Sequence, residues 1–199
     1  MFSIVVQAGG QSRRLGQNKA LVPFLGQPLI SRVISRVSDL AEEILVTTNN
    51  PEDYPFLDIP LIPDIEPGAG ALGGIYTAIN TATHPQIAIV ACDMPFVNAN
   101  LLNAQHKMLL DSDADAVIPV SQKGLEPFHA VYQKETCLAA LEQTIGRGEK
   151  RVQTWLDAIN IIRVDTKEIT QHDPEGIAFT NINRGDDLAK ALRLATCQG

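Results

Sequence analysis

Hydrophobic residues along the chain follow two alternating patterns. Short apolar runs that end in glycine or a polar residue are typical of strands buried on both faces, and they cover residues 3–8, 43–49, 59–64 and 86–92. Between the first two runs, apolar side chains recur every three or four positions from Leu29 to Leu40, with Arg32 and Arg36 on the opposite side. This spacing predicts an amphipathic helix.

The same alternation continues through the rest of the chain. The predicted helices are residues 29–40, 75–82, 99–110, 134–144, 149–158 and 186–195, and further strands are predicted at 116–120, 127–132 and 160–165. Because strands and helices alternate with short connections, the pattern predicts an α/β protein with a mostly parallel, twisted sheet and helices on both faces. A chain of 199 residues that is 45% hydrophobic is expected to form a single domain, 1–199.

Composition narrows the classes of ligand and compartment. A net charge of −7 disfavours binding to nucleic acid, which needs a broad basic face. The apolar runs are too short to cross a membrane, and no basic leader precedes the first strand. The three cysteines are widely spaced, which argues against disulfides and structural zinc. We therefore expect a cytoplasmic protein with a small ligand.

The loop after the first strand concentrates positive charge in this acidic chain. It contains three glycines and the cations Arg13, Arg14 and Lys19. Its spacing fits neither the dinucleotide fingerprint nor the P-loop, because five residues separate Gly10 from Gly16 and the lysine is followed by alanine. Arginine and lysine suit a polyphosphate, so the loop predicts a phosphate site. The alternative is a surface loop with solvated cations.

Polar side chains also end two later strands. Asp93 follows the most apolar strand and Asp64 ends the run "LIPD". Ligands of open α/β sheets bind at the carboxyl ends of the strands, and a carboxylate there suits Mg²⁺. The alternative for Asp93 is a turn cap before proline. The glycine-rich loop 66–74, which includes Gly70 and Gly74, either lets backbone approach a base or ribose or is only a flexible connection.

With these motifs, the chain resembles the molybdenum cofactor guanylyltransferase family. The matching segments are "QAGGQSRRLGQNKA", "GQPLI", "GALGG", "CDMPF", "GEKRV" and "FTNIN", and they span nearly the whole chain. The resemblance implies a Rossmann-like, three-layer α/β/α fold of the nucleotide-diphospho-sugar transferase type. It also implies a nucleotide-binding half at about 1–97 and an acceptor-binding half at about 98–199.

The activity implied by the resemblance is Mg²⁺-dependent transfer of GMP from GTP to the terminal phosphate of Mo-molybdopterin, with release of pyrophosphate. By the same carry-over, Ala8, Gly9 and Gly10 contact GTP through their backbone and Lys19 binds its phosphates. Asp64 contacts the nucleotide, Asp93 holds Mg²⁺, and Arg13 and Arg14 face the phosphates with Lys19. Transient contact with proteins that insert the molybdenum cofactor is a further implied partnership.

Three positions depart from the family pattern. Gln7 stands where leucine is usual, which leaves open a contact between this polar group and the base. Ala71 replaces a common proline. The base-proximal asparagine expected after the second strand is assigned to Asn49, among the candidates at 47–50.

Acceptor residues are predicted from the second half of the chain. Arg151 in "GEKRV", with Lys150, and the pair Glu126 and His129 are the candidates for contacts to molybdopterin or its phosphate. Asn181 and Asn183 in "FTNIN", grouped with these acceptor residues, are candidates to complete the metal or phosphate shell. The alternatives are a solvated helix face for Arg151, helix capping for the asparagines, and a structural role for His129.

Two other functions remain open from the sequence. One is a related nucleotidyltransferase, either a cytidylyltransferase acting on the same cofactor or an enzyme that makes nucleotide sugars. The other is a catalytically silent nucleotide-binding scaffold for cofactor delivery.

Overall fold

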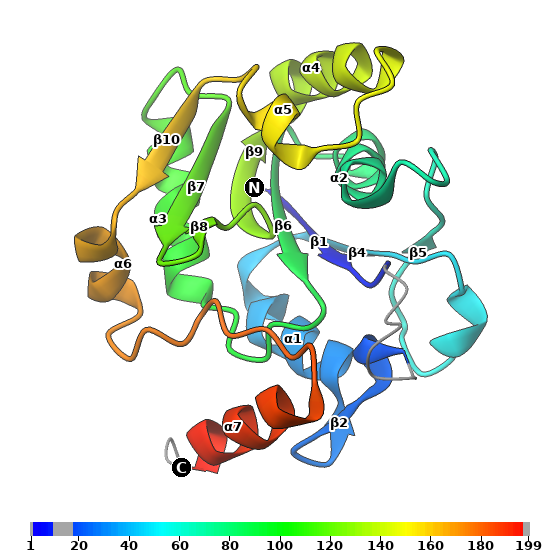
Figure 1. Ribbon diagram of the computed structural model, residues 1–199, viewed down its shortest axis with the longest axis vertical. Coiled ribbons are helices and arrows are strands. Elements are labelled where there is room, and N and C mark those ends of the chain that lie inside the picture. Colours follow the sequence, from blue (N-terminus) through cyan, green and yellow to red (C-terminus); the bar gives the residue numbers. More distant parts are fainter. Residues whose placement is uncertain (1, 10–17, 197–199) are drawn as a thin grey trace.

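The protein is built around one twisted, mostly parallel sheet (Figure 1). The computed structural model describes residues 2–9 and 18–196. The sheet has the order β10-β7-β9-β6-β1-β4-β5, with β8 paired to β7. Its strands are β1 (Ser3–Gln7), β4 (Glu43–Thr47), β5 (Leu61–Ile62), β6 (Gln86–Ala91), β7 (Ala116–Ser121), β8 (Gly124–Leu125), β9 (His129–Gln133) and β10 (Ile161–Val164). The predicted mostly parallel sheet is confirmed.

One strand of the main path runs against the others. β9 is antiparallel to both β6 and β7, whereas β1 is parallel to β4 and β6. A parallel crossover needs a dozen or more residues, and only 122–128 lie between β7 and β9. The short connection visible in the sequence therefore requires this reversal.

Helices cover both faces of the sheet. One face carries α1 (Leu29–Val37), α3 (Ala99–Leu110) and α6 (Thr166–His172), and the other carries α2 (Gly70–Thr81), α4 (Lys134–Gly146) and α5 (Val152–Leu156). Figure 1 shows α2, α4 and α5 together in the upper part of the view. Alternate residues of β1 serve the two cores, since Ile4 and Val6 pack with α1 and Val5 packs with α2. This is the expected three-layer arrangement.

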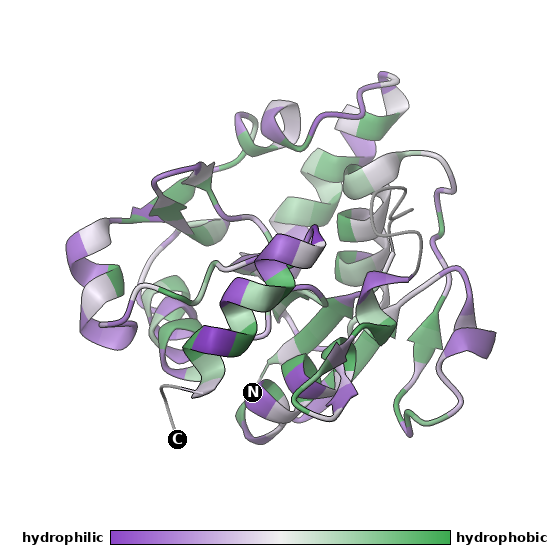
Figure 2. Cartoon of the chain, turned by 60° about the horizontal axis from the view of Figure 1, so that its bottom comes forward, coloured by the Kyte–Doolittle hydropathy of each residue, from purple (hydrophilic) through white to green (hydrophobic). Residues whose placement is uncertain are grey.

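A third, smaller core lies outside the two main layers. It joins α7 (Gly185–Thr196) to a hairpin formed by β2 (Pro23–Phe24) and β3 (Gln27–Pro28), and its buried members include Phe24, Phe96 and Ile182. Figure 2 brings α7 to the front, with its purple polar and green apolar positions side by side. Because α7 packs here, residues 181–183, which precede it, lie against elements from the first half of the chain.

Several predicted boundaries are wrong. The second helix begins at Gly70 rather than 75, so the second part of the predicted glycine-rich loop is helical. A Cβ at position 73 would lie 2.8 Å from the backbone oxygen of Glu66, which explains how glycine lets the helix start beside its own entry loop. Helix α6 and strand β8 were not predicted, and the first helix ends at Val37 before a 3₁₀ turn, Ser38–Leu40.

Both main cores draw residues from before and after position 97, so the two predicted halves share their cores. The functional division of the chain at that position stays a prediction. Among the described residues, no helix is long and apolar enough to cross a bilayer.

Candidate active site

The carboxyl ends of β1, β4 and β6 lie at one edge of the sheet. Gln7 is in register with Thr47 on one side and Ala91 on the other. Backbone bonds continue just past the strands, from Ala8 N to the Thr47 carbonyl (2.9 Å) and from Cys92 N to the Gln7 carbonyl (3.0 Å). The strand order reverses across β1, so this edge is the switch point where α/β sheets bind ligands.

Three polar side chains from distant parts of the chain meet at this edge. The Nζ atom of Lys19 lies 3.1 Å from Oδ2 of Asp93 and also donates a hydrogen bond to Oδ1 of Asn183. The side chains of Lys19 and Asp93 are 25% and 15% exposed, so the ion pair is accessible but partly desolvated. The structure thus brings together three predicted site residues.

Local hydrogen bonds hold the lysine in place. Lys19 begins a 3₁₀ turn, Lys19–Leu21, and the side chain of Asn18 caps that turn by accepting from Ala20 N. The same Asn18 amide donates to Asp53 Oδ2 (3.1 Å) and to the Tyr54 hydroxyl (2.9 Å). Asn18 was not predicted, although an asparagine directly before a short helical turn is an ordinary capping signal.

Asp93 and Asn183 are positioned by backbone contacts. The Asp93 carbonyl accepts from Ile182 N at 2.9 Å, which fixes the 181–183 segment against the loop after β6. The carboxylate of Asp187 accepts from the backbone N–H groups of Asn183 and Arg184. Asp187 was also missed, and its signal is an acidic residue in the first turn of α7.

A second polar pair lies at the ends of β4 and β5. Asn49 Nδ2 donates to Asp64 Oδ2 at 2.7 Å, and Asp64 N donates to Asn49 Oδ1 at 2.9 Å. A Cβ at Gly9 would be 4.0 Å from the same Asp64 oxygen, so the first loop begins beside this pair. Thr47 and Thr48 are buried, whereas Asn49 is exposed. The nucleotide roles of Asn49, Asp64, Ala8 and Gly9 stay predictions.

The first turns of α2 face the end of β1. A Cβ at Gly74 would lie 3.0 Å from Nε2 of Gln7, so the glycine leaves room for that amide. Gly70 has a φ of +62°, and a Cβ there would meet open space. Glycine backbone of α2 therefore lies beside the end of β1. Contact of Gly70 and Gly74 with a base or ribose stays a prediction.

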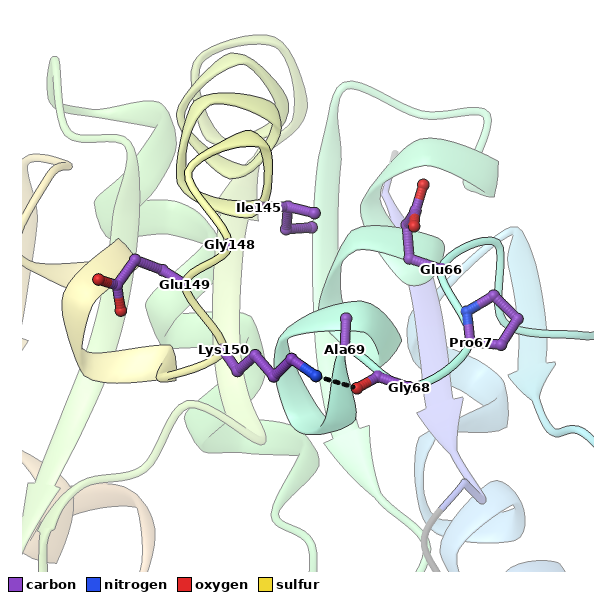
Figure 3. Close-up of a pocket in the computed structure, with 8 residues that line it drawn as sticks. All are labelled: Glu66, Pro67, Gly68, Ala69, Ile145, Gly148, Glu149 and Lys150. Atoms are coloured by element: carbon purple, nitrogen blue, oxygen red, sulfur yellow. Dashed lines mark hydrogen bonds between the residues drawn. The ribbon is translucent and has the colours of Figure 1, made fainter.

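A separate cavity of about 230 Å³ lies between the entry loop of α2 and the connection from α4 to α5 (Figure 3). Its lining residues are Glu66, Pro67, Gly68, Ala69, Ile145, Gly148, Glu149 and Lys150. Lys150 Nζ donates to the Gly68 carbonyl at 3.1 Å, as Figure 3 shows. Arg151 precedes α5 and is exposed, and its acceptor role stays a prediction.

The other acceptor candidates form hydrogen bonds to groups other than the side chains of Lys19 and Asp93. Glu126 is buried, and its carboxylate accepts from the Ser121 hydroxyl at 2.6 Å. His129 is fully buried in β9, where Nε2 accepts from Asn98 N and the ring packs edge-on against Phe179. Asn181 Nδ2 donates to the Phe179 carbonyl at 3.4 Å. These contacts fit the structural alternative for His129.

Burial of His129 predicts a pH dependence of stability. Desolvation lowers the pKa of His129 from 6.5 to about 4, so the unfolded chain binds a proton between these values while the native protein does not. The contribution of His129 to the free energy of unfolding is therefore fully present above pH 6.5 and is lost as the pH falls towards 4. In urea titrations, we expect wild type to lose about 2 kcal/mol more than His129→Gln between pH 7 and pH 5. Equal losses for the two proteins would contradict this prediction.

The donor set at the sheet edge fits Mg²⁺. The described residues contain no group of three or more histidine, cysteine or acidic side chains that would form an all-protein metal site. Asp93 and Asn183 instead offer one carboxylate and one amide oxygen that already share a cationic partner, Lys19. Mg²⁺ commonly binds through one or two carboxylates and takes its other ligands from phosphates and water.

The neighbouring thiol is not a competing ligand or nucleophile. Burial raises the pKa of Cys92 well above its usual range, and the adjacent Asp93 charge raises it further. Three residues predicted to contact GTP lie outside the described residues: Gly10, through its backbone, and Arg13 and Arg14, through its phosphates.

Related sequences identify the family of this chain. Residues 4–163 match the sequence pattern of the MobA-like NTP transferase domain. A probable molybdenum cofactor guanylyltransferase of Pelotomaculum thermopropionicum is 31% identical over 191 residues, which cover 96% of this chain and 92% of the relative. The molybdenum cofactor guanylyltransferase of Desulfosudis oleivorans is 30% identical over 188 residues, covering 94% and 92%.

A solved structure extends the agreement to the fold. Molybdopterin-guanine dinucleotide biosynthesis protein A from Archaeoglobus fulgidus superposes with a TM-score of 0.86 at 27% identity, over 98% of this chain and 99% of that protein. The resemblance found in the sequence motifs is confirmed. The chain belongs to the MobA-like NTP transferase domain family.

Proposed function

We propose that this protein transfers GMP from GTP to the terminal phosphate of Mo-molybdopterin, forming molybdopterin guanine dinucleotide and pyrophosphate. The observation that carries the proposal is the cluster of Lys19, Asp93 and Asn183 at the carboxyl edge of the sheet. The names of relatives that align over nearly the whole chain support the choice of guanine and of molybdopterin. The proposal includes a cytoplasmic location and transient contact with proteins that insert the cofactor.

Charge neutralisation is the main task of such a site, because an anionic phosphate must approach an anionic triphosphate. An ammonium group has three N–H donors, and Lys19 uses two of them on Asp93 and Asn183. The third has no partner among the described residues and, in this proposal, donates to a phosphate oxygen of GTP. Lys19 would then stabilise charge that moves onto the leaving pyrophosphate.

In this proposal Asp93 would hold Mg²⁺, with Asn183 as the second protein oxygen. When bound, the ion withdraws charge from the phosphate oxygens and helps orient them. The carboxylate of Asp93 would supply the negative charge that attracts a divalent cation to this edge of the sheet, where Lys19 already contributes a positive charge.

No protein base is needed for the attack. A phosphate monoester has a second pKa of about 6 and is largely ionised at neutral pH. This agrees with a site that has no histidine beside Lys19 and Asp93 among the described residues, since His129 is buried and bonded to the backbone of Asn98. The protein's contribution is binding and alignment of two anions.

A nucleotide panel tests the proposal. We expect purified protein with Mo-molybdopterin and Mg²⁺ to release pyrophosphate with GTP at least tenfold faster than with ATP, CTP or UTP, and mass spectrometry to detect the guanine dinucleotide. Omitting the acceptor is the control. A preference for CTP would indicate the cytidylyltransferase alternative. GTP binding without pyrophosphate release would indicate a silent scaffold, and either result would overturn the proposal.

A further inference from the structure

We propose that the side-chain amide of Gln7 reads the base of the nucleotide, donating from Nε2 to the carbonyl oxygen O6 of guanine. This inference rests on the function proposed above. Gln7 is 9% exposed, and its Nε2 atom is buried without an acceptor among the described residues. A buried N–H group without an acceptor destabilises the free protein. A ligand that supplies the acceptor forms the missing hydrogen bond and therefore binds more tightly.

The position of Gln7 places this donor at the ligand edge of the sheet. It is the last residue of β1, and side chains alternate along the strand, so Gln7 shares the face of Val5, which packs with α2. The backbone oxygen of Gln7 accepts from Cys92 N, one residue before Asp93. The backbone of Gln7 is thus hydrogen-bonded next to Asp93, while its side-chain Nε2 atom forms no hydrogen bond to the described residues.

The helix opposite is built from residues that leave space for this amide. Gly74 lies so close that any Cβ would be 3.0 Å from Nε2 and 3.1 Å from Oε1 of Gln7. One turn earlier, a Cβ at Gly70 would meet no atom within 4 Å. A planar base that enters beside the first turn of α2 would therefore meet backbone on one side and the Gln7 amide at its edge.

The chemistry of the amide distinguishes the bases. Guanine presents a carbonyl oxygen at C6 and an adjacent N1–H, which match the Nε2–H donor and Oε1 acceptor of glutamine. Adenine presents an amino group at C6 and an unprotonated N1, so with Nε2 and Oε1 of Gln7 placed as in this structure its donor would face the buried Nε2–H donor. An amide rotated by 180° would pair with adenine instead, and the ATP affinities of Gln7 variants distinguish the two orientations. A site that leaves a buried polar group unpaired rejects the wrong ligand more strongly than an apolar site does.

Binding measurements on Gln7 variants test this inference. Isothermal titration calorimetry would compare GTP, ITP and ATP, where ITP keeps O6 and N1–H but lacks the 2-amino group. For Gln7→Leu, we expect about tenfold weaker binding of both GTP and ITP, with ATP affinity equal to that of wild type or higher, because the opposed donor is removed. For Gln7→Glu at pH 8, which accepts but does not donate, we expect a larger loss for GTP and tighter binding of ATP.

The outcomes separate this inference from the proposed function. If wild type neither binds GTP nor releases pyrophosphate, the proposed function fails. If wild type uses GTP but Gln7→Leu binds GTP within twofold of wild type, or loses GTP and ATP equally, the base-reading role of Gln7 is overturned. Gly74→Ala is a matched second variant, because its Cβ would displace the amide, and it should reproduce the selective loss of GTP and ITP.

Discussion

Asp93→Ala is expected to lower the rate of GMP transfer at least about 10³-fold, equivalent to about 4 kcal/mol of transition-state stabilisation. Among the described residues, Asp93 supplies the only carboxylate in contact with Lys19, and in the proposed mechanism it is the one charged ligand for Mg²⁺. Its loss removes the attraction for the divalent ion and also one of the two oxygen partners of the lysine. Pyrophosphate release at saturating GTP and Mg²⁺ measures the effect.

The fold should survive this substitution. The contact that joins Asp93 to the last part of the chain uses its backbone carbonyl, which accepts from Ile182 N and does not depend on the side chain. The lost ion pair is partly exposed and is expected to contribute at most about 1 kcal/mol to stability. Circular dichroism and thermal melting should therefore remain close to wild type.

Two matched variants show whether the charge of Asp93 is what matters. Asp93→Asn keeps an oxygen for Lys19 but removes the charge, so it should be nearly as inactive as Asp93→Ala and should no longer respond to added Mg²⁺. Asp115→Ala removes a carboxylate that accepts from Asn160 N just before β7, at the opposite edge of the sheet, and should retain turnover. A folded Asp93→Ala protein with near wild-type turnover would refute the metal assignment.

The sequence was sufficient to predict which edge of the sheet holds the candidate site, because the signals are local. Each strand of the first half is an apolar run with a polar residue directly after it, and parallel strands bring those residues to the same edge. Asp93 and Asp64 could therefore be associated with the first loop from the sequence, whereas Asn49 was assigned through the family resemblance. The antiparallel β9 was also within reach, since the chain between β7 and β9 is too short for a crossover.

What the sequence did not predict depends on tertiary packing. The contact of Asn183 with Lys19 requires α7 to dock on the β2–β3 hairpin, and the predicted elements gave no reason for that position. The bond from Lys150 to the Gly68 carbonyl likewise joins segments that no local pattern relates. The burial of His129 also depends on tertiary packing. Its residue type left both an acceptor contact and a structural role open, and the fold buries it completely.

Lys19→Met should reduce kcat/KM for GTP at least tenfold, or about 1.4 kcal/mol, because it removes the ammonium while keeping a side chain of similar length. The lysine is held by the Asn18-capped turn and by two oxygen acceptors, so its third donor is oriented before the nucleotide arrives. Most of the loss should appear in kcat if the ammonium meets charge that develops on pyrophosphate, and in KM if it only binds the triphosphate.

The double variant Lys19→Met with Asp93→Ala gives the sharper result. Side chains that act as a unit are non-additive, so the combined loss should be close to that of Asp93→Ala alone rather than the product of the two single losses. Lys190→Met is the matched control, since Lys190 belongs to α7 and not to the sheet edge. Fully multiplicative losses would mean that Lys19 and Asp93 act independently, and would leave their 3.1 Å contact without a part in catalysis.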